Sequence, residues 1–93
     1  MYQRVITPSA KKSLKRLPHA AQVEVLHSPE SLSDHPYAGE QLHGSLNFLF
    51  SLHFKFHTVH YRVAYAIDHE RKLIIIHLVG PRENFYDRLR RLF

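Results

Sequence analysis

The stretch YRVAYAIDHERKLIIIHLV, residues 61–79, contains two apolar runs separated by a polar connection. In the first run, apolar side chains on alternate residues face one way and Arg62 faces the other, which is the period of a half-buried β-strand. The second run, residues 73–79, is apolar on both faces, as expected of an inner strand that is covered from both sides. The charged residues 68–72 predict the turn that joins the two strands.

The same alternation appears upstream in LHFKFH, residues 52–57. Its leucine and two phenylalanines share one face of the predicted strand, and His53, Lys55 and His57 share the other. Together with the two later runs, this segment predicts a three-stranded antiparallel meander. The segment YQRVI at residues 2–6 is β-branched and alternating, and it predicts a first strand.

Helical periodicity marks three further segments. The first begins at Pro8 or at a cap formed by Ser9, and it ends before the next proline. The second, residues 19–32, should end or kink where Pro29 interrupts it. The third is NFYDRLRRLF at residues 84–93, whose first residue, an asparagine, is the predicted cap.

The predicted order is therefore β-α-α-β-β-β-α, in a single domain over residues 1–93. This order belongs to the α+β class, with a twisted, mainly antiparallel four-stranded sheet and the helices packed on one face. The composition, 44% hydrophobic and 23% charged, is that of an ordinary soluble domain, and 93 residues allow a modest core.

The charge balance points to a polyanionic partner. Thirteen Lys and Arg stand against eight Asp and Glu, and nine histidines can add positive charge when protonated. The absence of cysteine excludes disulfides and thiolate zinc sites. The longest apolar run is too short to cross a membrane, and the first residues lack the apolar core of a signal peptide, so a cytoplasmic protein without a membrane partner is expected.

The candidate site is the sheet face that the helices are expected to leave open. It would present His53 and Lys55 on one strand and Arg62 on the next, above small alanines that form a shallow floor. Arg82 follows the last strand, and Tyr86 comes one helical turn later. Guanidinium groups bind phosphate oxygens in pairs and a phenol can stack on a base or share a proton, so this face suits a phosphodiester.

Each of these residues also has a structural interpretation. Arg62 can be an ordinary outward residue of a solvated strand, and Tyr86 can be a packing residue of an amphipathic helix. Arg82 can form a surface ion pair with Glu83. The residues alone leave both interpretations open.

The histidines do not predict a metal site. His53 and His57 share a predicted strand face, but at that spacing they would lie roughly 13 Å apart, too far to bind one ion. The sequence also lacks a phosphate-binding loop, a dinucleotide fingerprint and a hydrolase nucleophile motif. No metal or cofactor is therefore expected.

Four segments together resemble the RelE/ParE superfamily of bacterial toxins, which belong to type II toxin–antitoxin pairs. They are AKKSLKRLP at 10–18, LHGSLNFLFSLHF at 42–54, HYRVAYAID at 60–68 and LVGPRENFY at 78–86. The resemblance covers nearly the whole chain in the right order, and it implies a fold that agrees with the predicted element order.

The resemblance also implies an activity. RelE-like toxins cut mRNA in the ribosomal A site without a metal, through attack of the 2′-hydroxyl on the adjacent phosphate, which leaves a 2′,3′-cyclic phosphate and a 5′-hydroxyl. Arg62, Arg82 and Tyr86 match the arginines and tyrosine of these toxins. The implied partners are a cognate antitoxin, mRNA and the 70S ribosome, with operator DNA reached through the antitoxin.

One departure concerns the general base. RelE itself carries two lysines on the strand before the YR motif, where this chain has FLFSLHFKFH. His53, Lys55 and His57 lie nearby on the exposed face and could replace them. His53 is taken as the catalytic candidate, because a histidine is a better base than lysine at neutral pH. Lys55, His57 and His60 are the candidate substrate-binding residues.

Two other functions remain open on the same fold. ParE-like members of the superfamily poison DNA gyrase, and the missing lysines are compatible with that activity. A third possibility is a toxin that has lost its activity and acts only in a repressor complex with its antitoxin and DNA.

Overall fold

The computed structural model describes residues 1–27 and 30–93, so the expected break at Pro29 lies outside the described residues. The helices and strands follow the order β1 (Gln3–Ile6), α1 (Pro8–Lys15), α2 (His19–His27), α3 (Glu30–Asp34), β2 (Glu40–Gln41), a 3-10 turn (Gly44–Leu46), β3 (Leu49–Phe56), β4 (Val59–Asp68), β5 (Leu73–Pro81) and α4 (Phe85–Leu92). Within the described residues, no helix has the length and apolar character needed to span a membrane.

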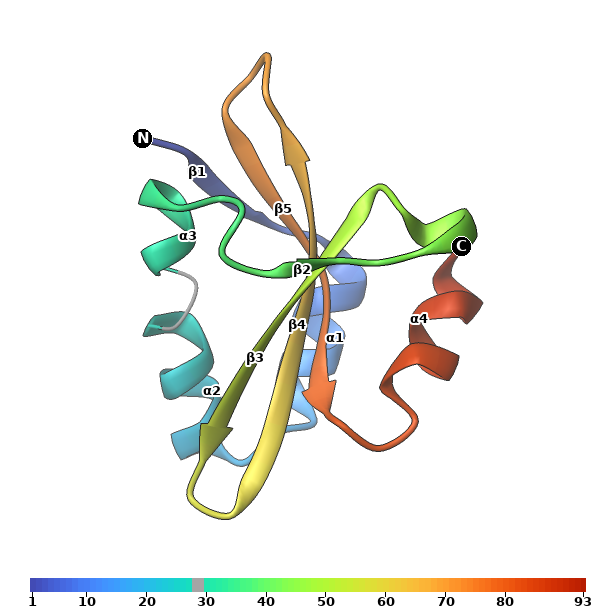
Figure 1. Ribbon diagram of the computed structural model, residues 1–93. Coiled ribbons are helices and arrows are strands. Elements are labelled where there is room, and N and C mark those ends of the chain that lie inside the picture. The colour runs from blue at the N-terminus through green and yellow to red at the C-terminus, as the bar shows by residue number, and fades with distance from the viewer. Residues whose placement is uncertain (28–29) are drawn as a thin grey trace.

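The strands form one sheet in the order β1-β5-β4-β3-β2 (Figure 1). β1 runs parallel to β5, and the other neighbours are antiparallel, so the predicted α+β class and mainly antiparallel sheet are confirmed. The sheet has five strands rather than the predicted four, because Glu40 and Gln41 pair with β3. A two-residue strand inside a turn-rich segment is too short to show a period in the sequence.

Helices α1 to α3 cover one face of the sheet, which is the predicted core face. Leu14, Val25 and Leu32 from these helices are buried against Val63 and Tyr65 of β4. The phenylalanines of β3 are half-buried beside them. The alternation read in β3 and β4 therefore assigned this face correctly.

The last helix does not lie on that face, so the prediction that all helices pack on one side is wrong for α4. Figure 1 shows α4 across the sheet from α2 and α3. Phe85 and Leu89 of α4 are fully buried in a second core with Leu78 and Ala64, so the expected open alanine floor is covered there. The cause is the doubly apolar β5, since Leu78 needs cover on the face opposite to Val79.

Hydroxyl groups of α1 replace the missing strand partner along the far half of β5. β1 pairs with residues 73–76 only. Beyond that point the Ser9 hydroxyl donates to the carbonyl of His77 at 2.9 Å, and the Ser13 hydroxyl accepts the amide of Val79 at 3.1 Å. These bonds satisfy backbone groups that the short β1 leaves unpaired, and they fix α1 against the sheet edge.

Replacement of Ser13 by alanine should lower the free energy of unfolding by about 1–3 kcal/mol, because it leaves the buried amide of Val79 without an acceptor. Urea denaturation of the wild type and the variant measures the loss. Ser45 is exposed and serves as the control, so Ser45→Ala should change stability by no more than about 0.5 kcal/mol. Equal effects of the two substitutions would contradict a structural role for the Ser13 hydroxyl.

Candidate active site

A row of facing residues crosses the three inner strands at the centre of the candidate site. His53 of β3 lies opposite Arg62 of β4, and Arg62 lies opposite Gly80 of β5. Residues that face each other across a sheet project to the same side, so the imidazole and the guanidinium lie on the α4 side. Gly80 has no side chain, so another group can approach the strand closely beside Arg62.

Tyr86 joins this row from α4. Its ring lies beneath the guanidinium of Arg62, whose Cζ is 5.1 Å from the ring centroid. Tyr86 is also half-buried against the second core, so it packs and contacts Arg62 at the same time. A cation over an aromatic face is attracted by the ring, and this contact restricts both side chains. Two of the candidate residues, Arg62 and Tyr86, are therefore in direct contact.

A second row lies one step further along the sheet. Lys55 faces His60, and the amide of Arg82 donates to the carbonyl of His60 at 2.9 Å, which extends the ladder past the end of β5. This bond continues the register of β4 and β5 by one residue, so the backbone of Arg82 lies beside His60, two residues beyond Gly80. Arg82 and His60 both line a hollow at the end of the hairpin. In the part of the chain that the structure describes, Arg82 and Glu83 form no salt bridge, so the ion-pair interpretation is not supported.

His57 is not part of either row, which corrects the expectation that it shares a strand face with His53. β3 ends at Phe56, and His57 occupies the turn with a φ of 56°. Its ring contacts the ring of Phe56, with the centroids 4.3 Å apart. Histidine is not a typical turn residue, so the alternating pattern predicted that the strand continues through His57.

The environment of His53 favours its neutral form. Partial burial lowers the pKa of His53 first, and the charge of Arg62 lowers it further, while Glu40 opposes them weakly. A histidine with a pKa below its ordinary value of about 6.5 is unprotonated at neutral pH. His53 can therefore accept a proton there. Over residues 1–27 and 30–93, no group of three metal-ligating side chains could hold an ion.

Arg88 is a member of the site that the sequence analysis missed. Its Nη1 atom lies 2.7 Å from the position that a Cβ on Gly80 would occupy, so the guanidinium rests directly on the glycine beside Arg62. A glycine inside a strand rich in β-branched residues signals close approach of another group, and this signal was available in the sequence. We call the surface formed by His53, Arg62, Arg82, Tyr86 and Arg88 the arginine face.

Comparison with known proteins identifies the family. Residues 5–90 match the family of the ParE-like toxin of type II bacterial toxin–antitoxin system. The chain belongs to this family of toxins. No curated protein matches the toxin's sequence.

Solved structures share the toxin's fold. The RelBE2 toxin–antitoxin complex of Mycobacterium tuberculosis contains a chain that is 29% identical, with a TM-score of 0.75 over 87% of the toxin and 98% of that chain. The archaeal RelE–RelB complex of Pyrococcus horikoshii contains one that is 25% identical, with a TM-score of 0.64 over 88% and 96%. A mutant of Escherichia coli RelE in the free state is 15% identical, with a TM-score of 0.76 over 99% and 98%.

The arginine face of the toxin combines three kinds of chemistry. Three guanidinium groups can hold the oxygens of a phosphodiester and stabilise charge that develops on them. The neutral imidazole of His53 can accept a proton from a hydroxyl group. The phenol of Tyr86 can stack on a base or move a proton.

Proposed function

We propose that the toxin is a metal-independent endoribonuclease that cuts mRNA at the ribosome and thereby inhibits translation. The observation that supports it most is the ring of Tyr86 beneath the guanidinium of Arg62, together with the backbone of Arg82 held to His60 two residues before Arg62 on β4. A guanidinium from β4 and another from the residue just past β5 can grip one phosphate from two directions. A protein without a phosphate to handle has no need of this arrangement.

In the proposed reaction the RNA 2′-hydroxyl attacks the adjacent phosphorus, and the 5′-oxygen leaves. The neutral His53 takes the proton of the attacking hydroxyl. Arg62 and Arg82 stabilise the charge on the phosphorane oxygens. Tyr86 donates its phenolic proton to the leaving 5′-oxygen, or it aligns the base by stacking and water supplies that proton. The products are a 2′,3′-cyclic phosphate and a 5′-hydroxyl end.

Lys55 and His60 extend the polar surface along the second row of the sheet, and we assign them to binding of the flanking RNA. His57 sits at the tip of the hairpin, where it can reach only RNA that continues past the second row. All of these contacts are electrostatic or stacking contacts, and the proposed reaction uses no cofactor.

The proposed partners are mRNA on the 70S ribosome and a cognate antitoxin. The toxin would bind operator DNA only indirectly, through the antitoxin. A similar chain of M. tuberculosis occurs in the RelBE2 toxin–antitoxin complex, and a similar chain of P. horikoshii occurs in a RelE–RelB complex. An antitoxin with acidic residues over Arg62 or Arg82 would block the site by charge complementarity. The reaction with ribosomes would take place in the cytoplasm.

Inhibition of DNA gyrase is the second candidate. It is favoured by the ParE-like description of the family and by a β3 strand without a pair of lysines. In this case the arginine face would bind a protein or DNA surface, and no RNA bond would break.

Primer extension on mRNA from cells that express the toxin tests the proposal. We expect new in-frame cuts within translated codons, with 5′-hydroxyl ends that polynucleotide kinase labels without prior phosphatase treatment. A supercoiling assay with purified gyrase runs in parallel. Inhibited supercoiling together with intact mRNA would replace the nuclease proposal by the gyrase proposal, and intact mRNA with normal supercoiling and normal growth would point to an inactive toxin.

The acid limb of the pH profile should report His53. A base must be unprotonated, and the pKa of His53 is lowered, so cleavage should rise with pH, and the midpoint of this rise should lie below about pH 6.5. His53→Gln should slow cleavage and remove this limb. The measurement is the single-turnover rate from pH 5 to pH 8. His57→Gln is the control, and it should keep the limb. A limb that survives in His53→Gln would assign the base to another group.

A further inference from the structure

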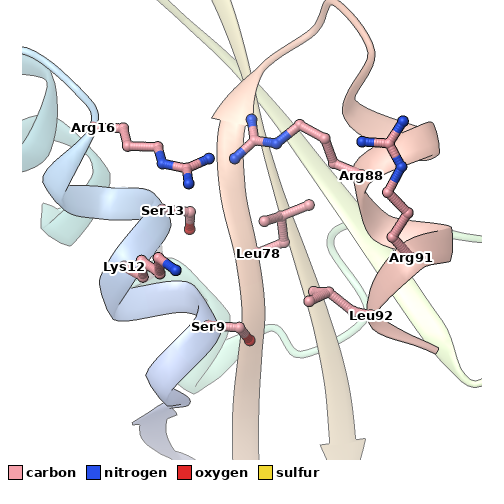
Figure 2. Close-up of a pocket in the computed structure, with 8 residues that line it drawn as sticks. All are labelled: Ser9, Lys12, Ser13, Arg16, Leu78, Arg88, Arg91 and Leu92. Carbon is pink, nitrogen blue, oxygen red and sulfur yellow. The ribbon is translucent and has the colours of Figure 1, made fainter.

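A positively charged pocket lies between α1 and α4, beside the half of β5 that β1 does not reach. Figure 2 shows the cations that line it: Lys12 and Arg16 from α1, and Arg88 and Arg91 from α4. Leu78 of β5 forms part of the wall between the two helices. We call this hollow the α1–α4 pocket.

The cations of the pocket have no carboxylate among them. No acidic residue lines the pocket, and within the described residues Lys12, Arg16, Arg88 and Arg91 take part in no salt bridge. Like charges brought together from two helices repel one another. Such a concentration of unpaired cations attracts an anion.

The pocket is also distinct from an ordinary solvated helix face. On α1, Lys11 and Lys15 are equally charged but are not part of the pocket lining, whereas Lys12 and Arg16 are. The wall of the pocket is fixed, because the Ser13 hydroxyl is bonded to the amide of Val79. Lys12 and Arg16 are one helical turn apart, and they lie across the pocket from the cations of α4.

Arg88 connects the pocket with the arginine face. Its guanidinium rests on Gly80, which faces Arg62, and the same side chain lines the α1–α4 pocket. In Figure 2 the guanidinium groups of Arg16 and Arg88 extend toward each other across β5. A single-stranded polymer with regularly spaced negative charges could therefore contact Arg62 and Arg16 by way of Arg88.

We propose that the α1–α4 pocket is a second phosphate-binding subsite, which holds the RNA backbone next to the phosphodiester bound at the arginine face. RNA as the ligand rests on the proposed function. RNA is favoured over an acidic protein segment because the arginine face and the α1–α4 pocket are continuous through Arg88. A polymer with one phosphate per residue needs such a continuous row of cations. Phosphates bound at both places would share Arg88 and fix the register of the strand.

The test compares two double variants of α1 with the same loss of charge. Lys12→Gln/Arg16→Gln removes two cations of the pocket, and Lys11→Gln/Lys15→Gln removes two outside it. The probe is a fluorescent hexanucleotide of 2′-O-methyl RNA, which lacks the attacking hydroxyl, so binding is measured apart from cleavage. Anisotropy titrations at several salt concentrations give the affinity and its salt slope.

We expect the pocket variant to bind at least tenfold more weakly and to lose about 1.4 from its salt slope, about 0.7 for each lost phosphate contact on a single strand. The control variant should stay within about threefold of the wild type, through long-range charge alone. Circular dichroism and thermal melting check that both variants are folded.

Equal losses in the two variants would overturn the subsite, because binding would then follow net charge alone. Failure of the wild type to bind the hexanucleotide would overturn it as well. A polyglutamate peptide that binds the wild type and loses affinity only in the pocket variant, with RNA binding unchanged, would assign the pocket to an acidic protein segment instead. Intact substrate RNA together with the expected binding pattern would reject the nuclease proposal and keep the subsite.

Discussion

Replacement of Arg62 by alanine should lower the rate of RNA cleavage by about 10²–10³-fold, the loss found when a donor to a developing oxyanion is removed. Arg62 is at the centre of the arginine face, with His53 and Gly80 on either side and Tyr86 under its guanidinium. Its removal takes away the proposed phosphate ligand and a neighbour that lowers the pKa of His53. The measurement is the single-turnover rate on RNA at saturating enzyme.

Arg62→Lys separates charge from geometry. Lysine keeps the positive charge but lacks the planar fork that binds two phosphate oxygens, so its rate should lie between those of the wild type and Arg62→Ala. Arg71→Ala in the exposed turn between β4 and β5 is the charge-matched control and should cleave at close to the wild-type rate. Arg82→Ala should show a loss similar to that of Arg62→Ala. A folded Arg62→Ala variant that cleaves RNA at full rate, or still arrests growth, would remove Arg62 from the reaction.

The positions of Arg62 and His53 could be predicted because strands alternate strictly. A single register decides which side every residue faces, and the apolar residues of β3 and β4 fix that register. Once Val63 and Tyr65 are assigned to the core, Arg62 has to project to the opposite side. The pairing of His53 with Arg62 then depends only on the hairpin connection, which the sequence located to within a residue or two.

The position of α4 could not be predicted in the same way. The helical spacing of Phe85, Leu89 and Leu92 predicted its apolar side, and Phe85 and Leu89 are buried while Leu92 is exposed. This spacing does not tell which face of the sheet the helix covers. The information was in β5, whose residues are apolar on both faces, and Leu78 needed a cover that α1 does not provide. Arg88 was missed for the same reason, since its contact with Gly80 exists only when α4 lies over β5.

The sequence did not predict the turn at His57 or the strand β2, because the residues at both places carry no clear local signal. A left-handed residue in a two-residue turn is commonly Asn or Gly, and neither is present at residues 57–58. Glu40 and Gln41 form a strand only because the edge of β3 is available to them. Tertiary pairing overrides a weak local preference in both places.

Leu89→Ala should lower the free energy of unfolding by about 2–5 kcal/mol, the cost of deleting a fully buried leucine side chain. Leu89 packs with Phe85 and Leu78 in the second core, and this packing holds α4 against the sheet. The loss should extend to function, because α4 carries both Tyr86 and Arg88. Urea denaturation measures the stability, and cleavage at a temperature where the variant is still folded measures the effect on the site.

Leu92→Ala is the matched control, with the same chemistry on the same helix at a position that is 41% exposed. It should cost about 1 kcal/mol or less, since little of its side chain leaves water on folding. Hydrogen exchange should show faster exchange of the α4 amides in Leu89→Ala than in Leu92→Ala, while the amides of β4 remain protected. If the two substitutions cost the same and exchange alike, Leu89 does not anchor α4, and the arginine face must be held in place by other contacts.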